Sequence, residues 1–107
     1  MNEILSQSEG GVLTLTFNRV ERKNSINVAM YDALATALER AVDDAATRVL
    51  LIQGHETVFS AGNDIEDFLR NPPAGKHSPV FRFLRGIASF PKPLIAAVCG
   101  PAVGVGT

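Results

Sequence analysis

Two short segments rich in glycine and other small residues are the places in this sequence where chemistry could occur. The first is Phe59-Ser60-Ala61-Gly62-Asn63-Asp64, and the second runs from Gly100 to Gly106. Each follows an apolar run, and small residues allow a ligand to approach the backbone closely. Where a helix starts after such a turn, its first N–H groups have no internal partner and point at the ligand. Two such turns on neighbouring strands can direct two N–H donors at one oxygen, which suits a carbonyl that becomes an oxyanion or enolate.

The same glycines also have a purely geometric interpretation, as tight turns. Nucleotide-binding motifs do not account for them. Gly100, Gly104 and Gly106 do not fit the G-x-G-x-x-G spacing of a dinucleotide fold, and Thr107 stands where a phosphate-binding loop needs lysine. Spacing alone leaves the geometric and the catalytic interpretations open.

Two groups of charged residues could take part in the expected site, one cationic and one acidic. Arg19, Arg22 and Lys23 form a cationic cluster that could meet a phosphate or simply form a solvated loop face. Three carboxylates near an expected helix start favour the helix dipole, and the first could also act as a cap. They show no spacing that would mark an acid/base couple; they are Asp64, Glu66 and Asp67.

The elements that must position these turns follow from the hydrophobic pattern. Val12 to Phe17 alternates between apolar and polar residues, which predicts a half-buried strand, with Ile4 to Ser8 as the other arm of a hairpin. After Asn27 as N-cap, apolar residues recur at helical spacing, which predicts a helix over about Val28 to Asp44.

The remaining elements alternate along the chain. Val49 to Ile52 is typical of a strand covered on both faces, and Leu94 to Val98 of a second buried strand. A short helix over Asn63 to Leu69 and a proline-rich loop over Asn71 to Pro79 lie between them. They are followed by a helix over Val80 to Ser89, with Val80, Phe83, Leu84 and Ile87 on one stripe. This alternation predicts an α/β layer with parallel strands.

Composition limits the classes of partner. The 107 residues are 46% hydrophobic and 20% charged, as in an ordinary globular domain or a part of one. A net charge of −1 argues against a nucleic-acid or anionic membrane partner. The single cysteine, Cys99, excludes an internal disulfide and is expected to be a small core residue. The N-terminus does not resemble a signal peptide, and glycines break the last apolar run, so a cytoplasmic protein without a membrane span is expected.

Three stretches of the chain resemble motifs of the crotonase (enoyl-CoA hydratase/isomerase) family. Asn18-Arg19-Val20-Glu21-Arg22-Lys23-Asn24-Ser25-Ile26-Asn27 resembles the stretch NRPxxxNAxN. Phe59-Ser60-Ala61-Gly62-Asn63-Asp64-Ile65 resembles the signature FSAGxDL. Lys92-Pro93-Leu94-Ile95-Ala96-Ala97-Val98, with Gly100 and Gly104, resembles KPxIAAVxGxxxGxG. Gly62-Asn63-Asp64, together with Asn24-Ser25-Ile26-Asn27 and Met30-Tyr31, looks more like the Δ3,Δ2-enoyl-CoA isomerase branch.

The resemblance implies an α/β fold of the crotonase type, a spiral of ββα units. Residues 1–107 would be its N-terminal part, truncated after the first half, because the chain stops in a glycine-rich stretch that normally leads into another element. The resemblance also implies an acyl-CoA thioester as partner, a role in fatty acid metabolism and assembly as a homo-oligomer, a trimer or hexamer. No cofactor is expected apart from the coenzyme A of the substrate, and no metal.

The resemblance also assigns roles to individual residues. The backbone N–H groups of Asn63 and Val105 would form an oxyanion hole for the thioester. Arg22 and Lys23 would contact the phosphates of coenzyme A, and Ser25 lies in the same loop. The remaining residues that it implies at the substrate are Ala61, Gly62, Asp64, Ile65 and Gly104.

The resemblance leaves the reaction open. The family's catalytic carboxylates fall beyond the position that matches Thr107, so the acid/base half of the site is not among these residues. Hydration, isomerisation, and hydrolysis or decarboxylation on the same fold all remain possible, and the acyl chain is undetermined. The alternative to an enzyme is a catalytically inactive fragment, or a non-enzymatic acyl-CoA-binding or assembly module.

Overall fold

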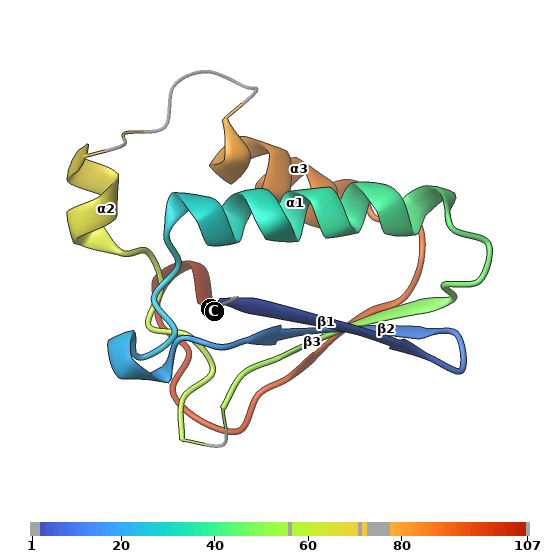
Figure 1. The fold of residues 1–107 in the computed structure, drawn as a ribbon, viewed down its shortest axis with the longest axis horizontal. Coiled ribbons are helices and arrows are strands. Elements are labelled where there is room, and N and C mark those ends of the chain that lie inside the picture. Colours follow the sequence, from blue (N-terminus) through green and yellow to red (C-terminus); the bar gives the residue numbers. More distant parts are fainter. Residues whose placement is uncertain (1–2, 56, 71, 73–77, 107) are drawn as a thin grey trace.

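The protein is described by a computed structural model that covers residues 3–55, 57–70, 72 and 78–106. A single mixed sheet has the strand order β1-β2-β3-β4. Its strands are β1 (Ile4–Glu9), β2 (Val12–Phe17), β3 (Val49–Gln53) and β4 (Leu94–Ala97). β1 and β2 form an antiparallel hairpin, whereas β2 pairs with β3 and β3 with β4 in parallel. The carboxyl ends of the three parallel strands therefore meet at one edge, where both glycine turns emerge (Figure 1).

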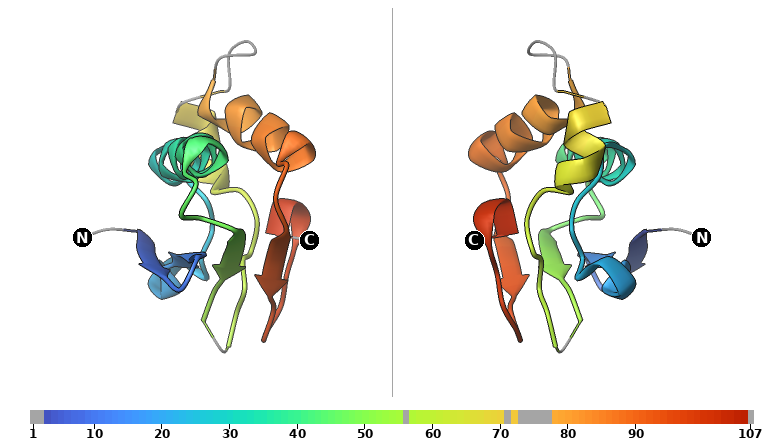
Figure 2. Two further views of the ribbon diagram at one scale, coloured as in Figure 1. Left: turned by 90° about the vertical axis from the view of Figure 1, so that its right-hand side faces the viewer. Right: turned by 90° about the vertical axis from the view of Figure 1, so that its left-hand side faces the viewer.

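The helices lie over one face of this sheet, with α3 beside α1 (Figures 1 and 2). The longest is held at its start by the side chain of Asn27, which accepts a hydrogen bond from the N–H of Met30 over 2.8 Å. Ser78 caps the start of the third α-helix in the same way. The helical elements are η1 (Val20–Arg22), α1 (Val28–Asp43), α2 (Ile65–Arg70), α3 (Pro79–Ser89) and η2 (Gly104–Gly106).

The core lies between the sheet and this helical layer. Alternate residues of β2 and β3 point into it, and the 3–4 spacing of α1 places a continuous stripe against them. The T-shaped contact of Phe17 with Phe59, at 5.3 Å between ring centroids, joins the end of β2 to the first glycine turn. The largest fully buried apolar side chains are Leu15, Ile26, Met30, Tyr31, Leu34, Leu38 and Leu50.

The predicted order of strands and helices is confirmed, with boundaries that differ by a few residues. α3 begins at Pro79, which was expected to end the preceding loop, because proline fits the first turn of a helix. The short η1 helix lies inside a segment that was expected to be a loop. Of the expected proline-rich loop, residues 71 and 73–77 lie outside the described residues.

The predicted burial of several elements was wrong. Only one face of β3 is buried, since the helices of the described chain cover one side of the sheet. β4 is an edge strand, and all its residues after Leu94 are exposed. Cys99, expected in the core, is exposed as well. On α3, Leu84 and Ile87 are 40% and 36% exposed, because they lie outside the surface that packs on α1.

In the described ranges, no helix has both the length and the apolar character needed to cross a membrane.

Candidate functional site

The first glycine turn is held in place by the loop that follows β2. The N–H of Ile26 donates to the carbonyl of Gly62 over 2.7 Å, and the N–H of Asp64 donates back to the Ile26 carbonyl over 2.9 Å. Asn63 lies between these two hydrogen bonds. Its backbone is therefore fixed on both sides, although neither bond uses its own N–H.

A buried carboxamide, that of Asn24, joins the same two segments. Its Nδ2 lies 3.3 Å from the carbonyl oxygen of Val58 and 3.2 Å from that of Phe59. Its Oδ1 accepts from the N–H of Arg19 over 2.8 Å, and its own carbonyl accepts from the hydroxyl of Ser60 over 3.0 Å. Asn24 has a φ of +53°, which asparagine tolerates better than most residues. All of its polar groups are used to hold the turn rather than a ligand.

An ion pair completes this support. Arg19 Nη1 lies 2.8 Å from Asp64 Oδ2 and donates to the carbonyl of Ser25 over 3.0 Å, and Arg19 Nε lies 3.0 Å from Glu3. The hydrogen bond from the N–H of Asp67, opposed by burial and assisted by Arg19, lowers the pKa of Asp64 below its usual value. Arg19 therefore does not belong to a phosphate-binding or solvated cluster, because it is buried against a carboxylate.

The second glycine turn lies alongside the first. The N–H of Phe59 donates to the carbonyl of Pro101 over 3.0 Å, and the N–H of Val103 donates to the carbonyl of Ser60 over 2.9 Å. These bonds pair the two segments in parallel. Val105 follows in the η2 turn.

The two turns touch at a position that only glycine can occupy. Gly62 has a φ of +90°, and a Cβ atom there would lie 2.8 Å from the carbonyl oxygen of Val103 and 3.6 Å from the Cα of Gly104. Carbon and oxygen atoms do not approach so closely without displacement. Gly62 thus permits both the backbone conformation and the contact between the turns.

The backbone N–H groups of Asn63 and Val105 remain available at these touching turns. Across the ranges that the structure describes, neither donates a hydrogen bond to another protein atom. Asn63 is half-buried and Val105 is 38% exposed, so a ligand can reach them. Unused backbone donors held in a rigid frame are suited to a carbonyl oxygen that gains negative charge.

The side chain of Asn63 turns toward the helices. The hydroxyl of Tyr31, on α1, donates a hydrogen bond to its Oδ1. The Tyr31 ring is fully buried and packs against Phe83 and Phe68, with centroids 5.5 Å and 6.4 Å away. Burial raises the pKa of Tyr31 to about 12, so its hydroxyl keeps its proton at neutral pH.

The residues expected at coenzyme A lie next to the first turn. Lys23 is exposed, and its carbonyl accepts from the N–H of Ala61 over 3.0 Å. The half-exposed side chain of Arg22 lies 3.3 Å from Glu66 and 3.8 Å from Asp64. A phosphate would therefore compete with these carboxylates for Arg22 but would meet Lys23 directly.

The other predicted substrate residues fall into two groups. Gly62 and Gly104 form the contact between the turns. Asp64 is a cap for α2, as the sequence suggested, since its Oδ1 accepts from the N–H of Asp67 over 3.1 Å. Ile65 begins α2, and its side chain is 74% exposed.

Two supporting residues, Asn24 and Tyr31, were not recognised from the sequence as parts of the site. Tyr31 shares the helical spacing of the buried residues Leu34 and Leu38, and this pattern could have predicted its burial. Nothing in the spacing could reveal its bond to Asn63, which is 32 residues away.

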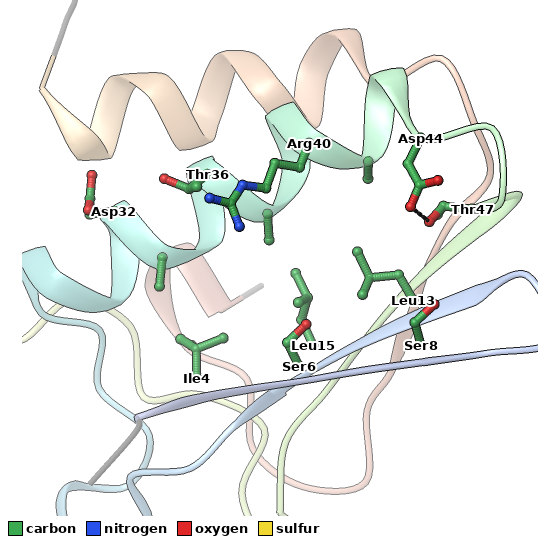
Figure 3. A pocket seen from close by; sticks show the side chains of 13 residues that line it. Ile4, Ser6, Ser8, Leu13, Leu15, Asp32, Thr36, Arg40, Asp44 and Thr47 are labelled. Atoms are coloured by element: carbon green, nitrogen blue, oxygen red, sulfur yellow. Dashed lines mark hydrogen bonds between the residues drawn. The ribbon is translucent and has the colours of Figure 1, made fainter.

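A separate groove of about 470 Å³ lies between α1 and the β1–β2 hairpin (Figure 3). Arg40 extends from α1 over a floor that includes Leu13 and Leu15. None of the predicted site residues lines this groove, so it is distinct from the two turns.

Known proteins resemble this chain over almost its whole length. Residues 7–107 match the model of the enoyl-CoA hydratase/isomerase family. Human enoyl-CoA delta isomerase 2 is 39% identical over 105 residues, which are 92% of this chain and 26% of that protein. The 1,2-epoxyphenylacetyl-CoA isomerase of Escherichia coli is 43% identical over 115 residues, with 99% of this chain and 43% of that protein covered.

Solved structures give the same result. The structure of OdaA from Pseudomonas aeruginosa superposes with a TM-score of 0.94 at 49% identity, over 99% of this chain and 43% of that one. The chain thus spans between about a quarter and two fifths of the length of these relatives. The α/β arrangement of crotonase-fold proteins is therefore confirmed for this part of their length, as is the resemblance to the delta-isomerases. The family match, which covers nearly every residue from the β1–β2 hairpin to the second glycine turn, establishes that this chain belongs to the enoyl-CoA hydratase/isomerase family.

Proposed function

We propose that the protein carrying this chain binds an acyl-CoA thioester and stabilises its enolate with the backbone N–H groups of Asn63 and Val105. One observation carries the proposal: these two donors have no acceptor in the described chain and lie on turns that touch at Gly62. As negative charge moves onto the thioester oxygen, both hydrogen bonds strengthen, and removal of the α-proton becomes easier. Each donor would supply roughly 2.7–4 kcal/mol of transition-state stabilisation.

The frame around the turn supports this role. Catalytic donors are effective when they need no reorganisation during the reaction. The hydrogen bonds of Asn24 hold the start of the turn, and the ion pair of Arg19 with Asp64 holds its end. Lys23, exposed next to Ala61, is the proposed contact for a phosphate of coenzyme A. Arg22 becomes available for the same role when the ligand displaces Glu66 from it.

The proton-transfer group is proposed to lie beyond residue 107. Asp64 is the carboxylate adjacent to Asn63, but its pKa is lowered and Arg19 occupies one of its oxygens, so it is a poor base at neutral pH. The names of two relatives, an enoyl-CoA delta isomerase and an epoxyphenylacetyl-CoA isomerase, favour isomerisation over hydration. We therefore propose movement of a double bond in an enoyl-CoA, in fatty acid metabolism in the cytoplasm, by a trimer or hexamer.

Among the described residues, the carboxylate next to Asn63 is paired with Arg19, which favours the second candidate for the chain by itself. Residues 1–107 alone would then be a catalytically inactive acyl-CoA-binding or assembly module. The two functions differ in turnover but share the thioester site.

The test is an assay of the naturally encoded protein that carries this chain, with 3-enoyl-CoA and 2-enoyl-CoA as substrates. We expect conversion of 3-enoyl-CoA to the 2-enoyl isomer, followed by absorbance of the conjugated thioester. Addition of water to 2-enoyl-CoA without isomerisation would instead identify a hydratase. If the protein neither binds nor converts any acyl-CoA, the proposal is wrong.

A further inference from the structure

The side chain of Asn63 has a donor group that the proposed oxyanion hole does not use. The hydroxyl of Tyr31 donates to Asn63 Oδ1, so the oxygen of the carboxamide faces the phenol. The oxygen and nitrogen of a carboxamide lie on opposite branches, so the two N–H bonds of Nδ2 point away from the phenol. In the part of the chain that the structure describes, Nδ2 has no acceptor.

The phenol that binds this carboxamide is itself fixed in place. The Tyr31 ring is 0% exposed and lies between Phe68 and Phe83, so its hydroxyl cannot move far. Burial raises the pKa of Tyr31 to about 12, so the hydroxyl is protonated at physiological pH. In the observed bond Oδ1 faces the phenol and Nδ2 is directed away from it.

No buried side-chain nitrogen or oxygen of the described residues lacks a partner, so Nδ2 is open to solvent and can be reached by a ligand. The backbone N–H of the same residue is also without an acceptor, and four covalent bonds separate the two nitrogen atoms. In an acyl thioester, an oxygen on the second or third carbon is three or four bonds from the carbonyl oxygen. One residue can therefore bind both oxygens of such a ligand at once.

We propose that Asn63 Nδ2, oriented by Tyr31, is a specificity determinant that binds an oxygen carried by the acyl group close to the thioester. The inference rests on the proposed function, since it requires the thioester at the backbone N–H of Asn63. The site then selects acyl-CoA esters with an ether, epoxide, hydroxyl or keto oxygen at the second or third carbon over pure hydrocarbon chains. Tyr31 is a positioning residue that does not touch the ligand.

The experiment uses two saturated ligands that the enzyme cannot isomerise. Butyryl-CoA and methoxyacetyl-CoA have acyl chains of equal length and differ by one methylene that is replaced with oxygen. Their dissociation constants are measured by calorimetry for the naturally encoded protein and for the variants Asn63→Ala and Tyr31→Phe. Thr16→Val is the control, because it removes another half-buried hydroxyl, one bonded to Gln53 over 3.0 Å and not to Asn63 or Val105.

We expect Asn63→Ala to lower the affinity for methoxyacetyl-CoA relative to butyryl-CoA by about 3- to 10-fold, the range of one neutral hydrogen bond. Tyr31→Phe should shift the ratio in the same direction by a smaller factor, and Thr16→Val should leave it unchanged. A purely structural role for Tyr31 or Asn63 would weaken both ligands equally and leave the ratio unaltered.

An unchanged ratio in Asn63→Ala, with both ligands still bound, overturns the inference and leaves the proposed function standing. If the unmodified protein binds neither ligand, the proposed function fails first and the inference falls with it. Thermal unfolding of each variant identifies a folding defect. If Tyr31→Phe is unfolded, the ratio measured for Asn63→Ala tests the inference, because that variant leaves the ring of Tyr31 in the aromatic cluster.

Discussion

The backbone and the side chain of Asn63 contribute differently to the site. The backbone N–H lies between two hydrogen bonds that fix the turn, and it is not used by either of them. The side chain is held from the other direction by Tyr31. Removing the side chain therefore leaves the proposed oxyanion donor present, whereas removing the N–H hydrogen eliminates it without breaking a hydrogen bond of the described fold.

This separation gives a sharp test with two variants of one position. On an unsubstituted enoyl-CoA, Asn63→Ala should keep substantial activity in the naturally encoded protein. Asn63→Pro, which lacks the N–H, should lose roughly 100-fold or more in kcat. Steady-state kinetics on both variants, with circular dichroism to confirm folding, is the measurement. Equal losses in two folded variants would exclude the backbone-donor role.

The buried pair of Arg19 and Asp64 should be worth far more than an exposed pair. Asp64→Ala leaves the Arg19 guanidinium buried beside a cavity and should lower the free energy of unfolding by about 3–5 kcal/mol. The control is Glu39→Ala, which breaks an ion pair of 2.7 Å to Arg82 on the surface and should cost about 1 kcal/mol or less. Urea unfolding of both variants at neutral pH compares them directly, and similar losses would contradict a buried role for Asp64.

Acid provides a second measurement of the same pair. The folded protein holds the pKa of Asp64 below its unfolded value, so the carboxylate's stabilising contribution is fully present above the unfolded pKa. This contribution is lost as the pH falls through the folded pKa. Urea unfolding below pH 4 should therefore show a steeper loss of stability in the unmodified protein than in Asp64→Asn.

At the scale of elements, the parallel sheet explains why two turns 40 residues apart in sequence meet. β3 and β4 are adjacent and parallel, so the segments after them leave the sheet at the same edge. The hydrogen bonds of Phe59 and Val103 continue that pairing beyond the strands. The site is thus an extension of the sheet, and the relative position of its two backbone donors depends on how closely the two segments approach each other.

Gly62 allows this close contact between the two segments, and replacing it should lower the stability of the fold. Gly62→Ala introduces a Cβ 2.8 Å from the carbonyl oxygen of Val103 at a φ of +90°, and should destabilise the fold by at least about 2 kcal/mol. Gly10→Ala is the matched control: its φ is also positive, +57°, but no atom lies within 4 Å of the added carbon. It should cost about 1 kcal/mol, from backbone strain alone. Thermal unfolding separates the two, and an equal cost would mean that the turns do not pack as described.

The elements could be predicted from sequence because their signals are local. The Asn27 cap, the alternation in β2 and the helical stripe of α1 all depend on neighbours within a few residues. Burial could not be predicted equally well: Leu84 and Ile87 were expected on one apolar stripe with Val80 and Phe83, yet they are 40% and 36% exposed.

The frame of the site was less accessible to sequence reasoning than its motifs. Motif matching located Asn63 and Val105, whereas the contacts that hold the first turn join distant residues. Arg19 is 45 residues from Asp64, and Tyr31 is 32 residues from Asn63. Such pairs have no characteristic spacing along the chain. Periodicity could therefore reveal that Tyr31 is buried but not what its hydroxyl binds.

At the scale of the whole molecule, the described residues would supply the proposed binding frame, and the proposed proton-transfer group would come from elsewhere. The two free N–H groups, the supporting network and Lys23 belong to the described chain. The carboxylate next to Asn63 is engaged by Arg19. The chain matches relatives over only 26% to 43% of their lengths, so other parts of those proteins are available for proton transfer.

If binding groups and proton-transfer group lie in different parts of the protein, residues 1–107 purified alone should show little or no turnover of 2-enoyl-CoA or 3-enoyl-CoA. The reason is that polarising a thioester does not by itself move a proton. The measurement is an absorbance assay on the 107-residue chain beside the naturally encoded protein at equal concentration, with acyl-CoA binding followed in parallel. Binding without turnover would support an acyl-CoA-binding module. Loss of both would mean that the frame needs further chain to form. Measurable turnover by the short chain would contradict the division, because a competent acid or base would then have to lie among these residues.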